Sequence, residues 1–139
     1  MGGRSGQSIS GKRKISAAQI SEGVDKIDNL PQGKIFDDAK RIDGVFKKST
    51  HGYSGTIEAF ESNSAKGELK TININEITIT QPNIQGNKIK NMLSVVDNIT
   101  PINVVQFKDG EKAIFDGHHR LMANWALGRT EIRVNIVVL

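Results

Sequence analysis

The pattern of hydrophobic and polar residues changes near the middle of the chain. From residue 68 onward apolar residues alternate or recur at regular spacings, whereas residues 1–67 hold only short apolar groups. We therefore predict a basic, flexible tail with short helices over residues 1–67, weakly helical and partly disordered. A folded module is expected over residues 68–139.

The second half alternates between the two kinds of periodicity. Thr71–Asn75 alternates as a half-buried strand does, and Ile77 and Ile79 continue the pattern after a slip. The i, i+3, i+4, i+7 spacing from Ile89 to Val96 predicts an amphipathic helix, with Asn87 as its N-cap. The remaining expected elements are strands at 102–107, 112–115 and 132–138, a hairpin turn at 109–110, and a helix from 118 to 127 that stops at Gly128. Their order predicts an α+β fold, a mixed sheet with two packed helices.

The first half gives weaker signals. Residues Ser16 to Leu30 predict a short helix capped by Ser16, and Phe36 to Phe46 a second helical piece. Residues 49–55 are expected to form a loop, followed by one helical turn around Ile57 and Phe60 and a polar linker over 62–67.

Composition narrows the classes of function. The 139 residues carry a net charge of +4 and no cysteine, which excludes disulfides, thiolate metal sites and cysteine nucleophiles. No apolar run is long enough to span a membrane, so a soluble cytoplasmic protein without a membrane partner is expected. Four cations form a basic arm near the start, either a solubilising tail or a contact to an acidic partner or nucleic acid: Arg4, Lys12, Arg13 and Lys14.

The candidate site lies at the beginning of the helix expected over 118–127. Asp116 and Gly117 make a turn after an apolar strand, and His118, His119 and Arg120 then fill the first helical turn. Helix N-termini favour anions, and cationic side chains there are unfavourable by themselves. Three of them together indicate a compensating anion, a phosphate in particular.

The same residues resemble the ParB/sulfiredoxin superfamily, which includes the N-terminal domain of ParB partition proteins, the sulfiredoxins and a group of free serine kinases. The resemblance rests on Thr100–Val105, Ala113–Ala123 and Leu127–Ile132. It implies that Gly117 lets the backbone approach a phosphate, and that His119 and Arg120 contact nucleotide phosphates. By the same resemblance Lys88 stands where sulfiredoxins place a phosphate-binding lysine, and Asn91 where they carry a hydroxyl.

The sequence also departs from these relatives. His118 stands at the sulfiredoxin cysteine, so sulfiredoxin chemistry is ruled out for want of a thiol. His118 and His119 replace the Glu-Arg pair of the partition motif. His118 is a candidate general base or nucleophile, or else a second phosphate donor. Asp116 is either a turn and cap residue or a carboxylate for Mg²⁺ or proton transfer. Adjacent helical residues diverge by about 100°, which disfavours a metal site at His118 and His119.

We therefore expect a domain that binds a nucleoside triphosphate, ATP or CTP, with Mg²⁺ as a candidate cofactor, and that acts as a phosphotransferase or NTP hydrolase. Two alternatives stay open. One is a ParB-like nuclease or DNA-associated module, whose cations hold a phosphodiester. The other is a non-enzymatic accessory protein of a phage or prophage, whose tail binds a protein partner. The sequence leaves open which nucleotide is bound, whether any reaction follows, and the oligomeric state.

Overall fold

The computed structural model describes residues 15–98 and 100–139, and the basic arm predicted between Arg4 and Lys14 lies outside them. Its helices are α1 (Ala17–Asp28), α2 (Gly52–Ser62), α3 (Gly86–Met92) and α4 (His118–Ala126), with 3₁₀ turns at Ser64–Lys66, Ile74–Glu76 and Leu93–Asn98. Its strands are β1 (Ala39–Arg41), β2 (Glu68–Asn73), β3 (Ile77–Thr78), β4 (Asn83–Gln85), β5 (Ile102–Gln106), β6 (Lys112–Ile114) and β7 (Glu131–Val138).

The main sheet has the strand order β2-β7-β5-β6-β3. The hairpin β5–β6 and the pair β2–β7 are antiparallel, whereas β5–β7 and β3–β6 are parallel. Gly110 turns the hairpin with a φ of +94°, a conformation that glycine adopts without strain. The α+β fold with a mixed sheet, predicted from the order of elements, is confirmed.

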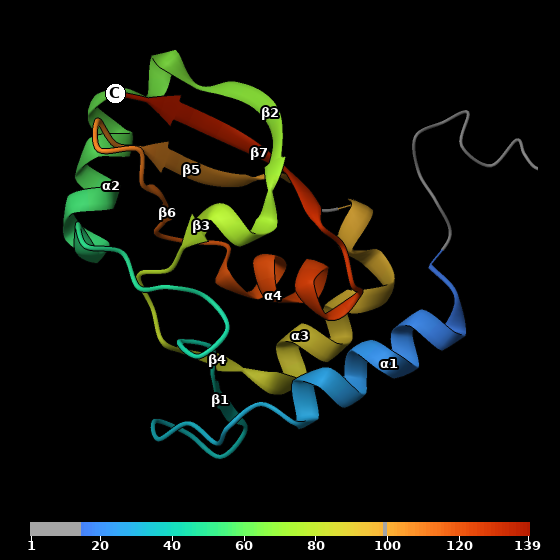
Figure 1. The fold of residues 1–139 in the computed structure, drawn as a ribbon. Helices are drawn as coiled ribbons and strands as arrows, with labels where there is room; N and C mark the ends of the chain where they lie inside the picture. Colours follow the sequence, from blue (N-terminus) through green and yellow to red (C-terminus); the bar gives the residue numbers. More distant parts are fainter. Residues whose placement is uncertain (1–14, 99) are drawn as a thin grey trace, which may run out of the picture.

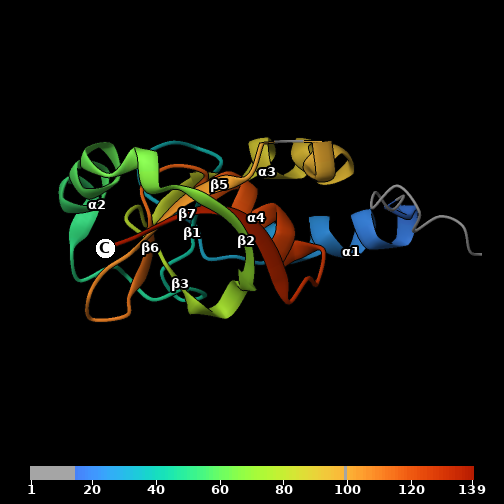
Figure 2. The same cartoon turned by 90° about the horizontal axis from the view of Figure 1, so that it is seen from above.

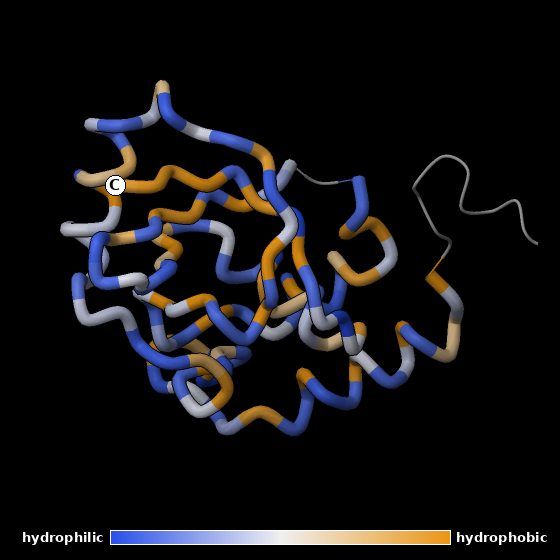
Figure 3. The backbone as a smooth tube through the Cα atoms, turned by 45° about the horizontal axis from the view of Figure 1, so that its top comes forward, coloured by the Kyte–Doolittle hydropathy of each residue, from blue (hydrophilic) through white to orange (hydrophobic). Residues whose placement is uncertain are grey.

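The helices form two groups that pack at different places on the main sheet. α4 packs against α3 and α1, while α2 lies beside β5 and β6 at the opposite end of the molecule (Figures 1 and 2). The central strands β5 and β7 carry much of the apolar sequence (Figure 3). Alternate residues of β7, such as Ile132 and Val134, face the larger core beneath α4.

The first half of the chain contributes to that same core. Ile27 and Ile42 are both 0% exposed and belong to one hydrophobic cluster with Leu121 of α4. A small antiparallel sheet of β1 and β4 joins the two halves further, with Lys40 opposite Ile84. The boundary at residue 67 stays a prediction, but side chains from residues 27–46 are part of the fold that the second half forms.

Some local predictions were right and others wrong. The helix near the start is confirmed, with a capping box in which Ser16 accepts from the Gln19 backbone N–H at 3.1 Å and Gln19 bonds back. The helix expected from Phe36 to Phe46 is wrong, because its backbone bonds go to β4 and to Pro31 instead of along a helix. The loop expected over 49–55 is wrong too, since α2 begins at Gly52.

The second half shows smaller differences. Asn87 lies inside α3, whose N-cap is Gln85, because the Asp38 carboxylate reaches across and accepts the Asn87 N–H at 3.1 Å. The single helix expected through Val96 becomes a 3₁₀ turn after Met92. The strands, the hairpin and α4 lie within a few residues of their expected bounds, and Gly128 follows α4 with a φ of +78°.

The shared core gives a direct test of the first half. We expect Ile42→Ala to lower the free energy of unfolding by about 2–5 kcal/mol, because a fully buried isoleucine leaves a cavity. Urea denaturation measures this. Ile35→Ala is the control, since Ile35 is 72% exposed and its loss should change stability by no more than about 0.5 kcal/mol. Equal effects of the two variants would show that residue 42 is not packed as described.

Candidate functional site

α4 begins at a sharp reversal of the chain. β6 ends at Ile114, and Gly117 then serves as the N-cap with a left-handed φ of +82°. The first bond of the helix runs from the Leu121 N–H to the Gly117 carbonyl at 2.9 Å. The N–H groups of the three preceding residues therefore have no partner within the helix, and they point out of its N-terminus. Such an end attracts anions.

Arg120 adds a cation to this end of the helix. Its Nη1 donates to the Thr100 carbonyl at 2.6 Å, and the Nη2 lies 3.1 Å from where a Cβ of Gly117 would stand. No carboxylate pairs with it in the described part of the chain. Arg129 beyond the other end of α4 differs, because it binds both carboxylate oxygens of Asp97. Arg120 is thus a fixed cation with donors left for a ligand.

His118 is buried beneath the start of the helix and is 1% exposed. Its Nε2 accepts the Thr80 backbone N–H at 3.0 Å, so the proton of the neutral ring lies on Nδ1. Nδ1 is buried without a hydrogen-bond partner among the described residues. Burial, and to a lesser extent the neighbouring His119, lowers the pKa of His118 to about 4.

His119, the next residue, also accepts a backbone hydrogen bond through its ring. Its Nε2 accepts the Gln85 backbone N–H at 3.0 Å. Burial lowers its pKa to about 4, the positive charge of Lys88 contributes in the same direction, and Asp38 opposes them. Hydrogen bonds to the two histidines therefore hold residues 80–85 against the first turn of α4.

These contacts correct the inference drawn from charge alone. Both histidines are neutral near pH 7, so the first turn of α4 carries one cation, Arg120, and not three. The surroundings of His118 do not favour proton transfer either, because its basic nitrogen is already bonded and its ring does not reach solvent. Both residues hold the backbone around the site, and the positive electrostatic character of this helix end comes from Arg120 and the free N–H groups.

The structure brings Lys88 to the same region. Lys88 is exposed on α3, which packs on α4, and its charge acts on His119. Asn91 follows it three residues later, on the same side of the helix, and is also exposed. Asp116 is exposed beside Gly117 and has no ion pair or side-chain hydrogen bond within residues 15–98 and 100–139. Over those ranges no three His, Asp or Glu side chains gather as metal ligands would.

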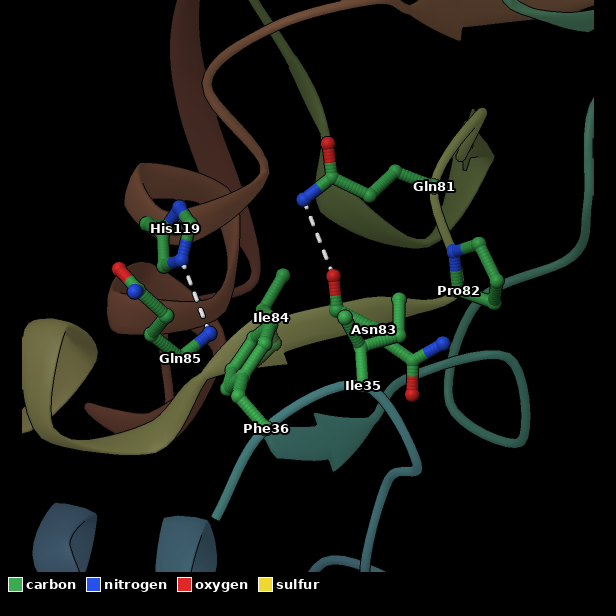
Figure 4. A pocket seen from close by; sticks show the side chains of 8 residues that line it. All are labelled: Ile35, Phe36, Gln81, Pro82, Asn83, Ile84, Gln85 and His119. Atoms are coloured by element: carbon green, nitrogen blue, oxygen red, sulfur yellow. Dashed lines mark hydrogen bonds between the residues drawn. The ribbon is translucent and has the colours of Figure 1, made fainter. Parts of the chain in front are cut away.

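A cavity of about 310 Å³ adjoins the first turn of α4, and no pattern in the sequence predicts it. Figure 4 shows its lining residues, among them His119 of α4 and Ile35 and Phe36 from the loop before β1. The rest of its wall comes from the segment that the histidines hold: Gln81, Pro82, Asn83, Ile84 and Gln85. Only His119 of this lining was a predicted site residue, since Phe36 was expected in a helix and residues 81–85 carried no prediction.

The family pattern of the ParB N-terminal domain matches residues 58–139, more than half of the chain. The protein belongs to this family, which confirms the resemblance of its second half. Among solved structures it is similar to a sulfiredoxin from Arabidopsis thaliana, with 25% identity and a TM-score of 0.46 over 52% of this chain and 86% of that one. No curated protein matches. Within the described ranges, no helix has the length and apolar character needed to cross a membrane.

The low pKa of His118 predicts loss of stability in acid. Between about pH 6.5 and 4 the unfolded chain binds a proton at this residue that the folded protein does not, so stability falls as pH falls. From pH 7 to pH 5 the loss for this one residue is roughly 2 kcal/mol. Urea titrations of wild type and His118→Gln measure it. The variant should lose less on acidification, and two parallel pH profiles would contradict the assignment.

Gly117 should tolerate no side chain. A Cβ there would stand 2.6 Å from the Ile102 Cγ2, in a backbone conformation that already disfavours other residues. We expect Gly117→Ala to destabilise the fold by more than about 1 kcal/mol. Gly128→Ala is the matched control, because Gly128 has a similar φ of +78° and nothing within 4 Å of its Cβ position. A smaller loss for Gly117→Ala than for Gly128→Ala would contradict the close contact with Ile102.

Proposed function

We propose that the start of α4 binds the phosphates of a nucleoside phosphate, ATP or CTP. The observation that supports this most directly is Arg120, a cation without a carboxylate partner in the described chain, held against Gly117 at a helix end with free N–H groups. A guanidinium can bind two phosphate oxygens at once. Membership of the ParB N-terminal domain family fits the position of the site.

Other residues would complete the phosphate site. Lys88 would add a second positive charge from α3, and Asn91 an amide donor from the same side of that helix. Gly117 would let the phosphate approach the backbone. Asp116 is the exposed carboxylate at hand for a Mg²⁺ that arrives with a triphosphate, since Mg²⁺ is commonly bound by one or two carboxylates together with phosphate oxygens. The proposal is one of binding, and Asp116 is the exposed carboxylate beside the site that a phosphotransferase or NTP hydrolase reaction could use.

A thermal-shift panel tests the proposal with ATP, CTP, GTP, tripolyphosphate and a short DNA duplex, each with and without Mg²⁺. A ligand at about 100 times its Kd should add roughly 2.7 kcal/mol of apparent stability, a shift of several degrees. We expect nucleotides and tripolyphosphate to give this shift and Arg120→Ala to remove it. Lys88→Ala should reduce it.

Arg133→Ala is the control for loss of one positive charge, because Arg133 is exposed on β7 and lies outside the site. It should keep the full shift. A shift with DNA alone would replace the proposal with a nucleic-acid-binding function. No shift with any compound would refute phosphate binding and favour a protein that acts through protein contacts.

A further inference from the structure

The cavity and the proposed phosphate site share one residue. His119 is the second residue of α4, so its backbone N–H belongs to the free helix end while its ring lines the cavity. The same ring accepts the Gln85 N–H and so holds one cavity wall in place. The helix end and the cavity are therefore joined through this one residue.

The cavity wall is mostly hydrocarbon. Ile35, Phe36, Pro82 and Ile84 supply apolar or aromatic surface, and the polar residues of the lining are Gln81, Asn83, Gln85 and His119 (Figure 4). A volume of about 310 Å³ is at the small end of the range for ligand sites. It suits one ring system with part of a sugar. Aromatic and aliphatic walls hold flat heterocycles by stacking and burial.

Ile35 is an apolar residue of this wall that is largely exposed to solvent. It is 72% exposed, the highest value among the large hydrophobic residues described as exposed. An aliphatic side chain in this position gains stability only when something covers it. Phe36 beside it is half-buried and presents its ring to the same space.

We propose that this cavity holds the nucleobase of the bound nucleotide, with Ile35 and Phe36 closing over the ring. The inference rests on the proposed phosphate site, which fixes the other end of the ligand. The cation Arg120 follows His119 in α4, and the ring of His119 lines the apolar cavity, so one residue links the two kinds of surface that a nucleoside phosphate requires. The loop that carries Ile35 and Phe36 precedes residue 58, so these two residues of the base site come from outside the part of the chain that matches the family, and the rest of the lining comes from within it.

Isothermal titration of ATP, CTP, tripolyphosphate and adenosine tests this on the full chain. Wild type should bind at least one nucleotide about tenfold or more tightly than tripolyphosphate, because the base adds buried apolar area. Ile35→Ser should weaken the nucleotide about fivefold or more and leave tripolyphosphate unchanged. Val95→Ser is the control, since Val95 is also an exposed aliphatic residue, 46% exposed, and does not line the cavity.

Each result has a distinct meaning. Equal affinity for nucleotides and tripolyphosphate, with no effect of Ile35→Ser, overturns the base site and leaves the phosphate site standing. Binding of adenosine that Ile35→Ser weakens, with no binding of tripolyphosphate, supports the base site and refutes the phosphate site. No binding of any of the four compounds overturns both. Phe36→Leu gives a second variant, which should act like Ile35→Ser through the loss of ring stacking.

Discussion

The arrangement around α4 depends on two hydrogen bonds accepted by neutral histidines. The Nε2 atoms of His118 and His119 take the backbone N–H groups of Thr80 and Gln85, so a segment far away in the sequence is held at the helix N-terminus. A protonated imidazole carries hydrogen on both nitrogens and could accept neither bond. Burial lowers both pKa values to about 4 and so keeps the rings in the form that the contacts need.

Because both histidines are neutral, the positive charge of α4 and its ends comes from the arginines. Arg120 lies in the first turn of α4 and Arg129 lies beyond its last residue, and their surroundings differ. Arg129 binds Asp97 and also donates to Asn124 at 3.1 Å, so it is committed to holding the 3₁₀ turn after α3. Arg120 bonds only backbone carbonyls within the described chain, which position its guanidinium without neutralising it. A cation held in this way keeps most of its attraction for a phosphate, because no carboxylate has to be displaced.

The sequence predicted those parts in which local pattern and tertiary contacts agree. α4 has a glycine on either side and regular apolar spacing, and the β5–β6 hairpin has Asp109 and Gly110 at its turn. The prediction for Phe36 to Phe46 was wrong because local pattern and tertiary contacts disagree there. The apolar residues of this interval do enter the core, as Ala39, Ile42 and Phe46 show, but ladder bonds to β4 replace the helix that their spacing suggests.

Neither the state of the histidines nor the cavity could be predicted from sequence. An imidazole at a helix start is charged or neutral according to what covers it, and the covering segment lies 34 to 38 positions earlier in the chain. The cavity likewise needs both Ile35, from the loop before β1, and His119, whose ring bonds to Gln85 of β4.

The pairing of β1 with β4 also joins a segment outside the family match to one inside it. The helix end and its arginine lie within residues 58–139, the part that matches the family, whereas the loop with Ile35 and Phe36 lies before it. Changes in this loop can alter the wall of the cavity without touching the bonds that hold α4. Ile35 and Phe36 can therefore vary in this wall, whereas the rest of the lining, from Gln81 to Gln85 and His119, lies in the same part of the chain as the helix end.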